Sequence, residues 1–136
     1  MKKFICEKHP TIEFVWPVHP NPNVKDVVYD SLKNIPQVKL VPPLDYFELL
    51  QEMANAKLIW TDSGGIQEEA PFFKKPVLIL RNVTERPEVV HAGFGVLVGT
   101  NIEKIIIKAK ISSEVQQIHK RCCRQYQHVA LQLILT

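Results

Sequence analysis

The stretch "LIWTDSGGIQEEAP", Leu58 to Pro71, decides the fold expected for this chain. An apolar run, Leu58–Trp60, leads directly into a turn that contains two of the five glycines, and a polar segment follows. This order is typical of a buried β-strand whose carboxyl end passes through a tight turn into a helix. Pro71 is expected to end that helix early, because proline lacks a backbone N–H and clashes with the preceding turn.

Four other apolar runs have the β-branched or aromatic character of strands that are covered on both faces. They are Ile12–Trp16, Val38–Val41, Val77–Leu80 and Val96–Val98. Helix-period segments lie between the runs. Asn23 is the expected N-cap of one helix, and Asp45 with Glu48 forms a capping-box pattern at the start of another. The alternation predicts an α/β fold with a Rossmann-like parallel sheet and helices on both faces.

Composition divides the chain near residue 104. The 136 residues suffice for one domain, and their net charge is +3. Lys and Arg number 11 against 13 acidic residues up to residue 103, but six against one from there on. The expected organisation is therefore an α/β domain over 1–103 and a divergent basic and apolar tail over 104–136, helical or disordered.

Several classes of function are disfavoured by composition. No apolar run reaches the roughly 18 residues of a membrane span, so no membrane partner is expected. Six cations in the tail, without interleaved aromatics, are a weak footprint for nucleic acid. The three cysteines are an odd number, which favours a reducing, cytoplasmic location.

The glycine turn has the composition of a phosphate site. Gly64 and Gly65 would permit backbone angles closed to other residues and would let an anion approach the main chain, where N–H groups and the helix dipole favour phosphate. Ser63 adds a hydroxyl, and Glu68 and Glu69 offer acceptors for sugar hydroxyls. The alternative is an ordinary connection between strand and helix, since Gly-Gly turns are common.

Two further loops would place polar side chains at the same carboxyl edge of the sheet. In "TERPE", residues 84–88, Arg86 precedes Pro87, which is favoured at a first helical position; Arg86 could clamp a diphosphate or pair with the neighbouring acids. In "PVHPNPNV", residues 17–24, His19 could contact a ligand or bond to its own backbone. The convergence of three loops on one edge favours a ligand site.

These motifs, with "KPVLILRNVTERPE" (75–88) and "AGFGVLVGT" (92–100), resemble the C-terminal domain of the bacterial non-hydrolysing UDP-N-acetylglucosamine 2-epimerase family. The resemblance runs from about residue 1 to about residue 103, and it implies that 1–103 is an incomplete nucleotide-sugar-binding domain. It implies the C-terminal half of a two-domain glycosyltransferase-B (GT-B) fold, with the UDP-sugar in the cleft between two Rossmann-like domains. It also implies conversion of UDP-GlcNAc to UDP-ManNAc by elimination and re-addition of UDP, with no metal or redox cofactor, in a homodimer.

The resemblance also implies roles for individual residues. Ser63, Gly64 and Gly65 would bind the diphosphate, Glu69 the ribose hydroxyls, and Arg86 the nucleotide end.

Other roles that the resemblance implies concern the sugar and the base. His19 would lie near the sugar end and a regulatory substrate site. The family's aromatic residue against uracil corresponds to the segment Leu44–Leu49, where Leu49, Tyr46 and Phe47 are the alternatives.

The chain departs from the family pattern at both ends. The N-terminal domain that supplies the catalytic carboxylates is not represented, nor is the Gly-His-Arg-Arg-Glu stretch expected just before Met1, and nothing after Lys104 resembles the family's Asn-Pro-Tyr-Gly-Asp-Gly signature. We therefore expect a gene truncated at the front and frameshifted near its end. The resulting fragment would bind UDP but have no catalytic residue of its own. The alternatives are a nucleotide-sugar glycosyltransferase domain and a non-catalytic binding module.

Overall fold

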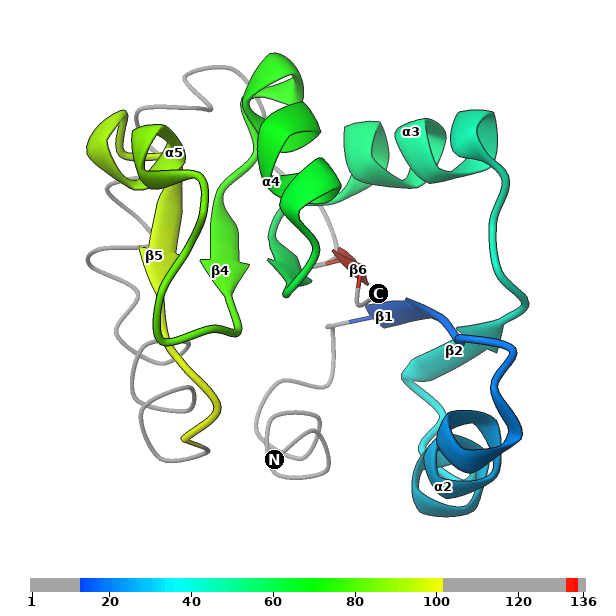
Figure 1. Cartoon of the computed structure of the whole chain (residues 1–136). Helices are drawn as coiled ribbons and strands as arrows, with labels where there is room; N and C mark the ends of the chain where they lie inside the picture. The colour runs from blue at the N-terminus through cyan, green and yellow to red at the C-terminus, as the bar shows by residue number, and fades with distance from the viewer. Residues whose placement is uncertain (1–12, 102–131, 135–136) are drawn as a thin grey trace.

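The computed structural model describes residues 13–101 and 132–134, which form parallel strands with helices on both sides (Figure 1). The elements follow one another as β1 (Glu13–Pro17), α2 (Pro22–Leu32), β2 (Val38–Val41), α3 (Tyr46–Asn55), β3 (Ile59–Thr61), α4 (Gly64–Glu69), the 3₁₀ helix η1 (Ala70–Phe73), β4 (Val77–Ile79), α5 (Pro87–His91), β5 (Gly95–Leu97) and β6 (Gln132–Ile134). The five strands expected from the sequence are present, each within one residue of its expected bounds.

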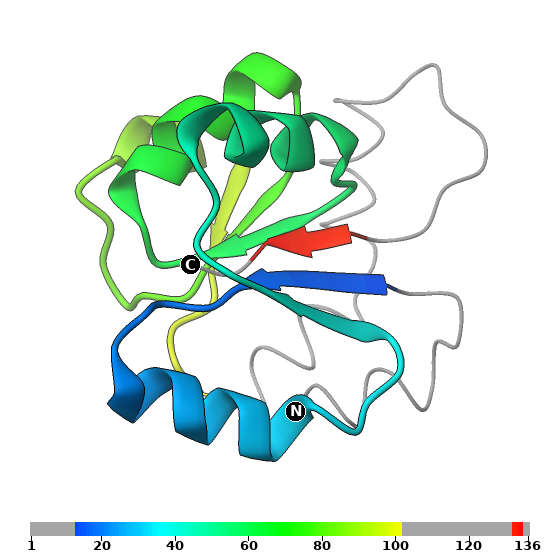
Figure 2. The same ribbon diagram turned by 90° about the vertical axis from the view of Figure 1, so that its right-hand side faces the viewer.

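The strands pair in two three-stranded sheets, ordered β2-β1-β6 and β3-β4-β5, and every pair is parallel. Strand β6 lies between β1 and β3, so the two sheets continue one another (Figure 2). The predicted parallel α/β fold is confirmed. In such a sheet all strands end at one edge, and the loops after β1, β3 and β4 therefore meet there.

Helices cover both faces of the sheet, α2 on one and α3, α4 and α5 on the other (Figure 1). Alternate residues of each strand point to opposite faces, and the two cores divide accordingly. The core under α2 contains Phe14, Val28, Leu32, Trp60 and Leu78. The core under α3 and α4 contains Met53, Ala56, Ile59, Ile66, Ala70, Val77 and Ile79.

Local capping sets where the helices begin. The capping box at α3 is confirmed, because Asp45 accepts from the Glu48 N–H at 2.8 Å and Glu48 accepts from the Asp45 N–H at 2.9 Å. The N-cap expected for α2 is wrong: Asn21 holds that position, and its side chain accepts from the Asn23 N–H at 3.0 Å. Pro22 therefore takes the first helical position, where its missing N–H costs nothing.

The C-terminal strand β6 differs from the helical or disordered tail expected over 104–136. Its register with β1 is Glu13 opposite Gln132, Phe14 opposite Leu133 and Val15 opposite Ile134. The remainder of the tail and residues 1–12, which include all three cysteines, lie outside the described residues.

Candidate functional site

The turn between β3 and α4 leaves the first helical N–H groups of α4 uncapped by a side chain. Ser63 occupies the N-cap position but its hydroxyl makes no capping bond; its own N–H donates to Thr61 Oγ1 at 2.9 Å. The first N–H groups of a helix have no intrahelical acceptor, and they attract anions when no side chain satisfies them. The start of α4 therefore has the arrangement that a phosphate group requires.

Gly64 and Gly65 form the first turn of α4 with ordinary helical backbone angles. The expectation that they adopt angles closed to other residues is wrong, since the described glycines with positive φ are Gly93 and Gly99. A Cβ added at Gly64 would meet no atom within 4 Å. Neither backbone angle nor packing within the described chain requires glycine at position 64, and room for a ligand against the main chain stays a prediction.

Glu69 ends α4 and is half-buried. One carboxylate oxygen, Oε1, accepts a hydrogen bond of 2.8 Å from the hydroxyl of Tyr46, the first residue of α3. This hydrogen bond, with desolvation and the negative charge of Glu69, raises the pKa of Tyr46 above 10.0. A tyrosine hydroxyl is protonated at neutral pH, so Tyr46 is the donor in this bond and the carboxylate is the acceptor.

Arg86 is the N-cap residue of α5, and its Nε forms an ion pair with Glu68 Oε1 of α4. Its Nη1 also donates to the backbone oxygen of Glu85 at 3.4 Å. The expected ion-pair alternative for Arg86 is thus present, but the partner is Glu68 rather than the carboxylates next to it in sequence. The two side chains are 39% and 50% exposed, whereas the Arg86 Nε atom itself is buried.

Gln67 and Thr84, for which the sequence predicted no role, connect α4 to the loop that carries Arg86. Gln67 is 1% exposed, and its Oε1 accepts from the Thr84 hydroxyl at 2.6 Å. Thr84 Oγ1 also accepts from the Arg86 N–H at 3.0 Å. Gln67 lies in the segment after β3 and Thr84 in "TERPE". Because 17 positions separate them, the sequence pattern did not predict their contact.

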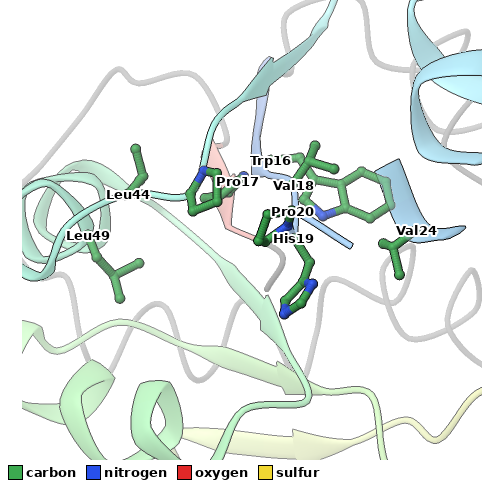
Figure 3. A pocket seen from close by; sticks show the side chains of 9 residues that line it. Trp16, Pro17, Val18, His19, Pro20, Val24, Leu44 and Leu49 are labelled. Carbon is green, nitrogen blue, oxygen red and sulfur yellow. The ribbon is translucent and has the colours of Figure 1, made fainter. Parts of the chain in front are cut away.

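His19 lies in a different part of the same edge. Its Nδ1 accepts from the Asn21 N–H at 3.2 Å, so it bonds to the backbone two positions on rather than to its own backbone, as the alternative role had it. It lines an apolar cavity of about 230 Å³ together with Trp16, Pro17, Val18, Pro20, Val24, Pro43, Leu44 and Leu49. In Figure 3 the imidazole lies between Leu44 and Leu49 on one side and Trp16 and Val24 on the other.

The structure places Gly64, Gly65 and Glu69 in α4 with Ser63 at its N-cap, and Arg86 of the neighbouring loop pairs with Glu68 of the same helix. None of these residues lines the apolar cavity. Of the three candidates for the base contact, Leu49 lines that cavity while Tyr46 is bonded to Glu69.

Within the described residues no three His, Cys, Asp or Glu side chains form a group that could hold a metal ion. The same part of the chain has no helix of the length and apolar character needed to cross a membrane.

The parallel sheet, with helices on both faces and an uncapped helix start at its carboxyl edge, defines the doubly wound class of α/β proteins. The family model described as UDP-N-acetylglucosamine 2-epimerase matches residues 3–129. The chain belongs to this family. The match extends beyond residue 103, where the motif resemblance ended, and it favours the epimerase over the glycosyltransferase alternative.

Individual relatives agree with the family match. A UDP-N-acetylglucosamine 2-epimerase of Yersinia pestis is 54% identical over 102 residues, which are 75% of this chain and 27% of that protein. One of Campylobacter jejuni is 43% identical over 124 residues, 91% of this chain and 32% of that protein. Thus the chain spans about a third or less of the length of these relatives.

A solved structure of UDP-GlcNAc 2-epimerase from Neisseria meningitidis, bound to UDP-GlcNAc, superposes with a TM-score of 0.83 at 40% identity. The superposition covers 89% of this chain and 33% of that one. These neighbours have a GT-B fold, so the chain corresponds to one part of that architecture.

Proposed function

We propose that this chain carries the UDP-binding half-site of a UDP-GlcNAc 2-epimerase. Ser63, Gly64 and Gly65 would hold the diphosphate, Arg86 would complete its coordination, and Glu69 would accept from the ribose hydroxyls. His19 would contact the sugar or a regulatory substrate from the adjoining loop. The relatives act on UDP-GlcNAc by name, and one neighbour is bound to it.

The observation that carries the proposal is the uncapped, unobstructed start of α4. The Ser63 hydroxyl makes no capping bond, and a Cβ at Gly64 would meet no described atom within 4 Å other than its chain neighbours and the helix backbone. A diphosphate oxygen could therefore approach the backbone N–H groups without displacing any side chain. Arg86, which forms an ion pair with Glu68 of α4, would supply the charge that balances the second phosphate.

The proposed chemistry divides between two sites. Elimination of UDP across C1 and C2 needs a base on carbon and a stabilised leaving phosphate. The groups around α4 would stabilise the leaving UDP, whereas the resemblance assigns the carboxylates that move the C2 proton to the family's N-terminal domain. We therefore expect this chain to bind UDP without epimerising UDP-GlcNAc by itself.

The setting proposed for this activity is the cytoplasm, which the odd number of cysteines supports. A homodimer is proposed for the complete enzyme on the family resemblance.

Calorimetric titration of the 136-residue chain with UDP tests the half-site. We expect saturable binding that is weakened about tenfold or more by Arg86→Ala, the loss typical of a hydrogen-bonded charge, and less by Ser63→Ala. Proton NMR of UDP-GlcNAc incubated with the chain should show no manno isomer. Steady accumulation of that isomer would contradict the division of roles, and absence of UDP binding would contradict the half-site itself.

A further inference from the structure

The tyrosine at the start of α3 is fixed in front of Glu69 by local structure. The capping box between Asp45 and Glu48 defines where α3 begins, and Tyr46 is its first residue. The ring packs edge-on against Phe47, with centroids 6.0 Å apart and planes at 65°. The ring is 57% exposed, yet its hydroxyl is committed to Glu69 Oε1 at 2.8 Å.

We propose that Tyr46 is a positioning residue that orients the Glu69 carboxylate for recognition of the ribose in a uridine nucleotide, an inference that rests on the proposed function. An ionised carboxylate offers about four lone-pair positions on its two oxygens. The bond from Tyr46 uses one position on Oε1 and restricts rotation of the carboxylate. Among the described residues none bonds to Oε2, which leaves it available to the two ribose hydroxyls.

This role gives Tyr46 a specific effect on ligand choice. A carboxylate that is already oriented loses less rotational freedom when the ribose binds, so the bond from Tyr46 increases affinity only for nucleotides that carry the hydroxyls. A nucleotide without them gains nothing from that orientation. Tyr46 should therefore contribute to discrimination between UDP and its 2′,3′-dideoxy analogue, although it need not touch either one.

The experiment compares UDP and 2′,3′-dideoxy-UDP by calorimetry on the full chain and on Tyr46→Phe, which keeps the ring against Phe47. We expect Tyr46→Phe to weaken UDP binding about threefold to tenfold, the range of one hydrogen bond to a charged group at a partly exposed position. Binding of the dideoxy analogue should stay the same within about twofold. Tyr29→Phe removes a hydroxyl from α2 and is the matched control, with no effect on either ligand.

Combination with Glu69→Gln adds a second readout. If Tyr46 acts through Glu69, the double variant should bind UDP no more weakly than Glu69→Gln alone. Equal UDP affinity of Tyr46→Phe and the unsubstituted chain, or equal losses for both nucleotides, would overturn the role of Tyr46 while leaving the half-site intact. Failure of the unsubstituted chain to bind UDP would overturn both.

Discussion

Thr84 donates a hydrogen bond of 2.6 Å to the buried Gln67, and so joins the loop before α5 to the inner face of α4. The same hydroxyl oxygen accepts from the N–H of Arg86. A single side chain therefore ties the arginine of the candidate site to the helix whose first turn would hold the phosphates. The position of Arg86 relative to α4 therefore depends on the hydrogen bond between Thr84 and the buried Gln67.

Thr84→Val should lower both the stability of the protein and its affinity for UDP. It leaves the buried Gln67 oxygen without its donor, which costs about 1–3 kcal/mol of unfolding free energy. The Arg86 backbone also loses an acceptor, so UDP binding should weaken together with stability. Denaturant unfolding and UDP titration of the same variant measure both effects. Thr100→Val changes an exposed threonine and serves as the control; a comparable loss in both variants would contradict the specific role of Thr84.

Gly64→Ala separates folding from ligand binding. Because an added Cβ has open space and the backbone is helical, unfolding free energy should be unchanged or rise by up to about 1 kcal/mol. The same methyl group would occupy the path of the diphosphate, and UDP affinity should fall by about tenfold or more.

Gly95→Ala is the control for Gly64→Ala, because at Gly95 an added methyl group has no room. A Cβ on Gly95 would lie 3.0 Å from both Ile79 Cδ1 and Val89 Cγ1, so Gly95→Ala should lower stability by about 1–3 kcal/mol. Unchanged UDP binding in a folded Gly64→Ala variant would contradict the placement of the phosphates.

Glu68→Gln should strengthen UDP binding. A diphosphate that binds Arg86 must compete with the Glu68 carboxylate, and a partly exposed pair of this kind contributes about 0.2–1 kcal/mol. Replacement by a neutral amide should therefore raise UDP affinity about twofold to fivefold at low salt. Glu88→Gln removes an equal charge from α5 without touching this ion pair and should have a smaller effect. Weaker UDP binding by Glu68→Gln would show that the pair holds Arg86 in place rather than competing for it.

The pKa of Tyr46 should reveal its hydrogen bond with Glu69. The folded-state pKa lies above 10.0 because of Glu69, so the contribution of this bond to stability is complete below about pH 10 and is lost as the pH rises through the folded-state pKa. Tyrosine ζ-carbon NMR titration should show Tyr46 deprotonating at lower pH in Glu69→Gln than in the unsubstituted chain. An identical titration in both would contradict the hydrogen bond.

The features predictable from sequence were those encoded by neighbouring residues. Continuous β-branched runs located five strands, and Asp45 with Glu48 located the start of α3, because strand character and capping depend on adjacent positions. Two asparagines two positions apart are equivalent as caps in sequence, and only Pro22 at the first helical position separates them.

Contacts between distant positions were not predictable in this way. The bond between Tyr46 and Glu69 spans 23 positions, and the ion pair of Arg86 bypasses the acids beside it for Glu68. The glycine pair does lie at the junction of β3 and α4, but the sequence did not show that both glycines have helical φ angles. Strand β6 was not predicted, because nothing in three residues of an apolar tail indicates that they pair with β1.

The position of β6 also has a consequence for synthesis of the protein. The strand that lies beside β1, the first described strand, is separated from it by more than one hundred positions in the sequence. The sheet cannot be completed while the ribosome is still translating the codons for residues 132–134. Until those residues have been synthesised, β1 carries an exposed edge with which chaperones or another nascent chain could pair.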